Sequence, residues 1–200
     1  MHPLENYLRG MVEMRKRGNF RIPPGFLYSS FEGYVLEHGH FLESSALDEE
    51  EVQLVQEVLE SAAARGVDVH EFKQCFANSQ SFVLEGDTDD FTYYEGYAIG
   101  RAPIPVHHGW VVINGKVIDL TWRLEQPASR VLLPGRPVGE LPKNWAYWGF
   151  PVENLEYIRA RVLARGMIGS LLEDWEANYP LLRGVDPNDE DSWRDLLEAS

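Results

Sequence analysis

The chain has 200 residues, 44% of them hydrophobic and 12% aromatic, which predicts one globular domain with a sizeable core and excludes a disordered chain. The net charge of −14 argues against nucleic-acid binding, because such proteins present a basic surface. The sequence holds no apolar run of 18 residues, so we expect no membrane-spanning helix. No signal peptide is expected at the amino terminus, and a single cysteine forms no internal disulfide, so we expect a cytoplasmic location.

The acidic charge is concentrated in two parts of the chain. Residues 31–100 carry 16 acidic and 2 basic side chains, and residues 167–200 carry 9 and 2. Blocks of this kind mainly contribute solubility. A solvated acidic face is therefore the favoured interpretation, and a cationic partner or substrate is the alternative.

Three helices are predicted in the first half of the chain. An apolar stripe predicts a helix over residues 3–17, with Gly18 as its C-cap. A second helix is predicted over residues 48–65, because acidic residues crowd its first turn and Gly66 follows it. A third is expected to begin near Gln74 and Cys75.

From Phe91 the pattern changes to that of strands. Aromatic and β-branched residues predict strands at 92–99, 106–113 and 116–122. Asn114 and Gly115 between the last two predict a type I′ hairpin turn, which needs positive φ at both positions.

The last third of the chain is expected to be loop and helix. Residues 127–142 hold four prolines and two glycines, which predicts a long irregular loop. A helical region follows over 153–176, interrupted near 166–169, and residues 186–200 form an acidic, mobile tail. Helices, then an antiparallel sheet, then helices predict the α+β class, as a single domain over residues 1–185.

The hairpin register determines which side chains share a face. With a two-residue turn, Val112 faces Val117, Trp110 faces Asp119 and His108 faces Thr121, and all six side chains lie on one face. His108 and Asp119 are then diagonal neighbours that an imidazole and a carboxylate can span. His107 projects from the opposite face.

This register offers a base and an orienting acid to the lone cysteine. Asp119 can hold one ring nitrogen of His108, so that the other points toward a nucleophile. Cys75 is that nucleophile if it opens a helix packed on the same face, because helix N-termini and an imidazolium favour the thiolate. As a single feature, a lone cysteine is more often a small buried hydrophobe.

Four segments in order resemble the core of the transglutaminase-like superfamily, relatives of the papain-type cysteine proteases. They are Gln74-Cys75-Phe76-Ala77-Asn78, Glu95-Gly96-Tyr97-Ala98, His108-Gly109-Trp110 and Val117-Ile118-Asp119-Leu120-Thr121-Trp122. The similarity covers residues 70–125 and implies an antiparallel sheet packed against helices. It makes Cys75 the nucleophile, His108 the base and Asp119 the orienting carboxylate. Gly109 and Leu120 depart from the usual alanine and proline.

Other residues are candidates for supporting roles. Beside the backbone N–H of Cys75, Gln74 and Asn78 are candidates for the second oxyanion donor, although capping or packing is the favoured role of Asn78. Tyr97 and Trp110 are expected to form core and cleft wall. No role is assigned to residues 147–151. No metal site is expected, because the histidine and aspartate clusters lack the spacing of zinc or calcium ligands.

These residues predict a cysteine-dependent hydrolase or acyltransferase that attacks an amide or peptide carbonyl through an acyl-enzyme. No cofactor is expected. The expected partner is a peptide or amide substrate, for which a positive charge suits the acidic chain. The alternative is a non-catalytic acidic binding or inhibitor protein on the same fold.

Overall fold

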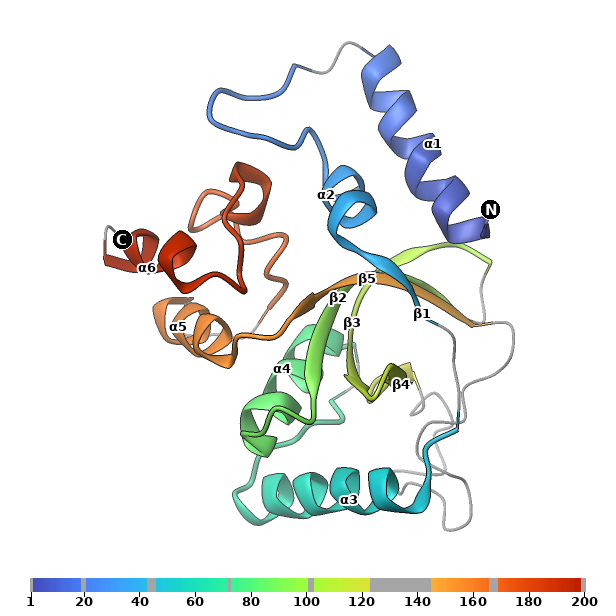
Figure 1. Ribbon diagram of the computed structural model, residues 1–200, viewed down its shortest axis with the longest axis vertical. Coiled ribbons are helices and arrows are strands. Elements are labelled where there is room, and N and C mark those ends of the chain that lie inside the picture. The colour runs from blue at the N-terminus through green and yellow to red at the C-terminus, as the bar shows by residue number, and fades with distance from the viewer. Residues whose placement is uncertain are drawn as a thin grey trace.

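The computed structural model describes residues 2–18, 21–42, 46–71, 73–100, 103–122, 145–165 and 169–198. Helices surround a curled five-stranded antiparallel sheet of order β1-β5-β2-β3-β4 (Figure 1). This arrangement confirms the α+β class. The elements are α1 (Pro3–Arg17), α2 (Phe31–His38), β1 (His40–Leu42), α3 (Glu49–Ala64), α4 (Cys75–Gly86), β2 (Thr92–Ile99), β3 (Val106–Ile113), β4 (Lys116–Ile118), β5 (Ala146–Val152), α5 (Leu155–Arg165), the short 3₁₀ helix η2 (Leu181–Arg183) and α6 (Glu190–Glu198).

The three predicted helices of the first half form as expected. Helix α1 has Pro3 in its first turn, and Gly18 closes it by donating to the Met14 carbonyl at 3.0 Å. Helix α3 begins with a capping box, in which Asp48 and Glu51 each accept the other's backbone N–H. Helix α4 begins at Cys75. Local signals were therefore sufficient for these elements.

The hairpin has the predicted turn and register. Asn114 and Gly115 have φ of 49° and 76°, the positive values that a type I′ turn requires. Val112 pairs with Val117, as expected. Strand β4 ends at Ile118 rather than at residue 122, and Asp119 Oδ1 accepts the N–H groups of Thr121 and Trp122 in the turn that follows. The expected pairings of Trp110 with Asp119 and of His108 with Thr121 therefore do not form, and only residues 111–113 of β3 pair with β4.

Two strands and one helix lie outside the sequence prediction: α2, β1 and β5. Strand β5 enters the sheet between β1 and β2. Its Pro151 pairs with Tyr94 of β2, while β1 reaches only to Gly149. Pro151 therefore lies beyond the end of β1, where no strand requires an N–H from it.

The C-terminal part also differs from the prediction. Helix α5 ends at Arg165, and residues 171–178 form turns instead of more helix. The expected mobile tail contains α6, whose Trp193 is 5% exposed and contacts Tyr157 of α5. The loop expected at 127–142 lies outside the described residues.

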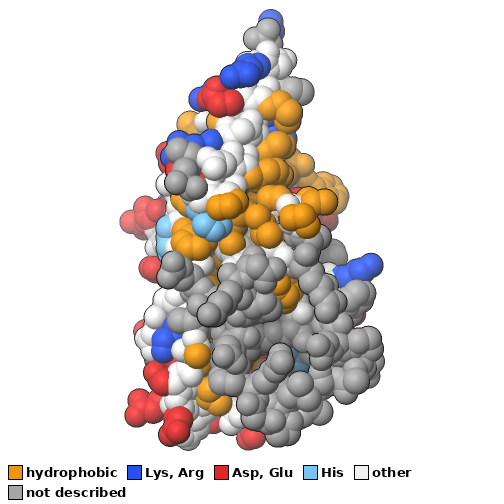
Figure 2. Space-filling model, turned by 90° about the vertical axis from the view of Figure 1, so that its right-hand side faces the viewer, with side chains coloured by type: hydrophobic (Ala, Val, Ile, Leu, Met, Phe, Trp, Pro, Cys, Tyr) orange, Lys and Arg blue, Asp and Glu red, His pale blue; other side chains and the backbone are white. Residues whose placement is uncertain are grey.

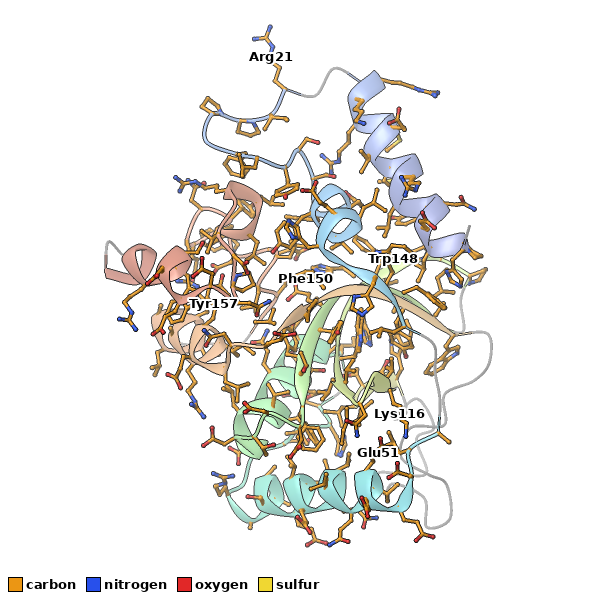
Figure 3. All side chains as sticks on the ribbon, viewed as in Figure 1. Arg21, Glu51, Lys116, Trp148, Phe150 and Tyr157 are labelled. Carbon is orange, nitrogen blue, oxygen red and sulfur yellow. The ribbon has the colours of Figure 1, made fainter. Side chains whose placement is uncertain are left out.

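The two faces of the sheet have different surroundings. One face, here called the helix face, packs against α1, α2, α4 and α5 in the main core (Figure 1). Trp148 and Phe150 of β5 point toward this side of the sheet, and Tyr157 belongs to α5, which packs there (Figure 3). The opposite face, here called the aromatic face, carries Tyr94, Ala98, Trp110, Val112, Val117 and Tyr147.

The side of the molecule shown in Figure 2 has hydrophobic side chains grouped near its middle and acidic side chains mainly along one edge. This distribution fits acidic residues that are solvated at the periphery. Among the described residues, no helix is both long and apolar enough to cross a membrane.

Candidate active site

The structure places His108 and Asp119 in direct contact on the aromatic face. His108 Nε2 lies 2.8 Å from Asp119 Oδ2, and both side chains are buried. They come from β3 and from the residue after β4, so the hairpin register brings them together. Nδ1 of His108 is the ring nitrogen that remains for another partner.

Four donors hold Asp119. Its Oδ1 accepts the backbone N–H groups of Thr121 at 3.0 Å and Trp122 at 2.9 Å. Its Oδ2 accepts a hydrogen bond from the Tyr147 hydroxyl at 2.8 Å, besides the contact with His108. Burial by itself raises the pKa of a carboxyl, but the charge of His108 and these hydrogen bonds outweigh it and lower the pKa of Asp119. Asp119 is therefore a fixed anion.

Cys75, at the start of α4, is the second group after Asp119 that raises the pKa of His108, so its side chain lies in the surroundings of the imidazole. The sequence prediction placed this helix on the face of His108, and that placement is wrong. Phe82 and Val83 of α4 belong to the core on the helix face. The first turn of α4 still lies close to His108, because Phe76 packs on Gly109 and β4 pairs only with residues 111–113 of β3.

The imidazole of His108 is held in its charged form. Burial lowers its pKa, but Asp119, by charge and hydrogen bond, and then Cys75 raise it to about 10. A positive charge therefore lies beside the carboxylate of Asp119.

Gly109 permits the close approach of α4 to β3. A Cβ on Gly109 would lie 2.9 Å from Phe76 Cδ1 and 3.2 Å from Phe76 Cα. These distances are shorter than ordinary contacts, so any larger residue would push the first turn of α4 outward. The departure from alanine at this position therefore has a steric reason in this chain.

Asn78 ties together the loop before the nucleophile and the turn after the acid. Its side chain accepts from the N–H of Glu71 at 3.0 Å and donates to the carbonyl of Glu71 at 2.8 Å and to Thr121 Oγ1 at 2.9 Å. Both amide hydrogens are used, which leaves none for an oxyanion. The packing alternative thus fits Asn78 better. Gln74 is exposed and forms no side-chain cap on α4.

The two predicted wall residues lie on opposite faces of the sheet. Trp110 is fully buried on the aromatic face, near His108. Tyr97 lies on the helix face, against Tyr7 and His107. Trp122 is the closer cover of the base, because its ring stacks on His108 with 4.3 Å between centroids.

Sequence reasoning missed a second buried polar cluster, centred on Glu95 of β2. Glu95 accepts from Tyr93 Oη at 2.7 Å, Ser170 Oγ at 2.5 Å and the N–H groups of Leu171 and Leu172 at 2.9 and 3.0 Å. Its Oε1 also lies 3.0 Å from His107 Nε2. No local signal marks Ser170, Leu171 and Leu172 as partners, because they lie 75 to 77 residues from Glu95 in sequence.

His107 lies on the helix face, as expected, but it is more than a surface residue. It bridges Glu95 and the half-exposed Glu173, whose Oε1 is 3.2 Å from Nδ1. Burial lowers the pKa of His107, but the two carboxylates raise it to about 9. The cluster anchors residues 170–173 to the sheet, which explains why this segment is not helical.

The arrangement of Cys75, His108 and Asp119 can generate a thiolate and move a proton at His108 Nδ1. Within the described part of the chain, no group of three or more histidine, cysteine and acidic side chains could hold a metal ion. Comparison of the chain with protein-family models, curated proteins and solved structures finds no match.

Proposed function

We propose that the protein is a cysteine-dependent hydrolase or acyltransferase that acts on an amide or peptide carbonyl. The observation that carries the proposal is the position of His108, which contacts Asp119 through Nε2 at 2.8 Å and whose pKa Cys75 also raises, while Phe76, next to Cys75, packs on Gly109. A buried imidazole with an acid on one side and a thiol on the other is the arrangement that activates a cysteine nucleophile.

The proposed reaction has two steps. The Cys75 sulfur attacks the carbonyl carbon, and the tetrahedral intermediate collapses as the C–N bond breaks and His108 donates its Nδ1 proton to the leaving amine. Water or a second amine then attacks the resulting thioester. His108 accepts the proton of this attacking group, the C–S bond breaks, and the thiolate returns.

Each supporting residue has a defined part in this scheme. Asp119 keeps the imidazole oriented and stabilises its charged form. The backbone N–H of Cys75, in the uncapped first turn of α4, is a donor for the oxyanion. No second donor is assigned.

The proposal extends to the fold family. The chain order of a nucleophile opening α4, a base on β3 and an acid after β4 is the order that the transglutaminase-like resemblance implies. The register of β3 with β4 supports this assignment. A peptide or amide substrate follows from the same resemblance.

Alkylation of Cys75 tests the proposal without a known substrate. Iodoacetamide labelling, followed by mass spectrometry as a function of pH, has one cysteine to report. We expect a midpoint well below about 8.5, the value of an ordinary cysteine. His108→Ala is expected to return the midpoint to about 8.5, and Asp119→Asn to lie between, because it disturbs the base without removing it.

The adjacent His107 provides the matched control. His107→Gln changes a histidine on the opposite face and is expected to keep the low midpoint. A simple aryl ester should also acylate Cys75 in the wild type and be released, whereas Cys75→Ser should not be acylated. The proposal would be wrong if the labelling midpoint of the wild type were that of an ordinary cysteine and His108→Ala did not change it. Cys75 would then be a core residue, and the binding-protein alternative would be favoured.

A further inference from the structure

Tyr147 contacts the acid of the site from a distant part of the chain. Its hydroxyl donates to Asp119 Oδ2 at 2.8 Å, the same oxygen that lies 2.8 Å from His108 Nε2. Tyr147 is fully buried. One carboxylate oxygen therefore serves two partners, and any change in one hydrogen bond changes the other.

The fold brings Tyr147 to Asp119 across two strands. Tyr147 lies on β5, and Asp119 follows β4, with β2 and β3 between them in the sheet. On the aromatic face, β2 presents Gly96 and Ala98 between them, and Ala98 is the direct pair of Tyr147. A Cβ on Gly96 would overlap the carbonyl oxygen of Trp148, so this glycine permits the close approach of β5, which carries Tyr147, to β2.

The ring of Tyr147 is also fixed by its neighbours. It makes an edge contact with Trp110, with 5.1 Å between centroids, and it lies 6.4 Å from the ring of His108. Such packing restricts the tyrosine to one orientation, so its hydroxyl is already directed at the carboxylate before any substrate binds.

We propose that Tyr147 is a positioning residue that sets the strength of the contact between Asp119 and His108. Its hydroxyl takes part of the negative charge of the shared oxygen and holds that oxygen in line with His108 Nε2. Tyr147 does not touch the reacting atoms. The effect of Tyr147 on the contact between Asp119 and His108 follows from the geometry alone. Its effect on catalysis rests on the proposed function.

Titration of His108 by imidazole NMR tests the inference. The measurement uses the full chain in a Cys75→Ser background, so that the thiol does not titrate. In Tyr147→Phe, Asp119 loses a donor and directs more charge to the imidazole, so we expect the pKa of His108 to rise by about half a unit. An altered packing alone would lower thermal stability without moving this pKa.

Tyr94→Phe is the matched control. Tyr94 belongs to the same aromatic cluster and stacks on Trp110, but its hydroxyl faces His40 at 3.5 Å instead of Asp119. We expect the pKa of His108 to be unchanged in this variant. Equal titration of His108 in the two phenylalanine variants would overturn the inference.

A second substitution keeps the test decisive if Tyr147→Phe folds poorly. Replacing Tyr147 with 3-fluorotyrosine keeps the ring and makes the hydroxyl a stronger donor, so the pKa of His108 is expected to fall. An unchanged or raised value would overturn the inference. Failure of the proposed function is seen separately, in the alkylation of Cys75 in the protein with Tyr147 intact.

Discussion

At the scale of single residues, the candidate site depends on three positions at which the residue type is required by its hydrogen bonds or by the space around it. Asn78 uses its whole amide to hold Glu71 and Thr121, and Asp119 accepts four hydrogen bonds. Gly109 contributes by the absence of a side chain. The residue types were visible in the sequence, but their partners, except for His108, were not.

Gly109→Ala is expected to separate the nucleophile from its base. The added methyl group overlaps Phe76 Cα and Cδ1, and overpacking of this kind costs about 1–3 kcal/mol. Because Phe76 follows Cys75, we expect a lower melting temperature and an alkylation midpoint of Cys75 nearer to that of an ordinary cysteine.

Gly10→Ala in α1 is the control for the Gly109 substitution. A Cβ at Gly10 meets no atom within 4 Å, so alanine there should be neutral or stabilising by up to about 1 kcal/mol. If Gly109→Ala were as stable and as reactive as the wild type, the close contact of α4 with β3 would not control the site.

At the scale of elements, the β3–β4 hairpin is positioned by its turn and by α3. Asn114 Nδ2 donates to Glu51 Oε1 at 3.0 Å, and Lys116 Nζ lies 2.5 Å from Glu51 Oε2. Figure 3 shows Lys116 and Glu51 lying close together, between β4 and α3. The hairpin tip is thus tied to the same residue that completes the capping box of α3.

Gly115→Val is expected to destabilise the hairpin, because a β-branched residue is strained at a φ of 76°. We expect a loss of about 1–3 kcal/mol in urea unfolding. Asn114→Gly keeps the positive φ and removes only the contact with Glu51, so a loss of about 1 kcal/mol or less is expected. Similar losses in both variants would contradict the strained-turn explanation.

At the scale of the whole molecule, two buried histidines couple stability to pH. Their ordinary pKa is 6.5, and the fold raises it to about 9 for His107 and about 10 for His108. Below pH 6.5 both are protonated in the folded and the unfolded chain, and their full contribution is present. Above pH 6.5 the unfolded chain loses protons that the folded chain retains, so stability falls.

We therefore expect the free energy of unfolding to decrease as pH rises from 6.5 toward 9 and 10. Each retained proton contributes a slope of about 1.4 kcal/mol per pH unit. Urea unfolding at intervals across this range measures the slope. His107→Gln should remove the part of the slope that His107 contributes and keep the part that His108 contributes. A free energy of unfolding that does not change with pH in the wild type would contradict the charged state of both residues.

The sequence by itself determined the local elements and one register. Caps, turn residues and apolar spacing placed α1, α3, α4, β2 and β3, because these signals act over a few residues. The two-residue turn at Asn114 and Gly115 set the pairing of β3 with β4. Alternation of side chains then predicts that His108 and Asp119 lie on one face of the sheet.

Only the tertiary structure decided which face α4 covers, where β5 inserts and what surrounds the buried charges. Tyr147 reaches Asp119 across 28 positions of sequence, and Ser170 reaches Glu95 across 75. Contacts at such separations depend on strand order, which no local pattern encodes. Residues 170–173 were predicted to be helical, but Ser170, Leu171 and Leu172 donate hydrogen bonds to Glu95 instead. A buried carboxylate is costly without hydrogen-bond donors, and these contacts supply them.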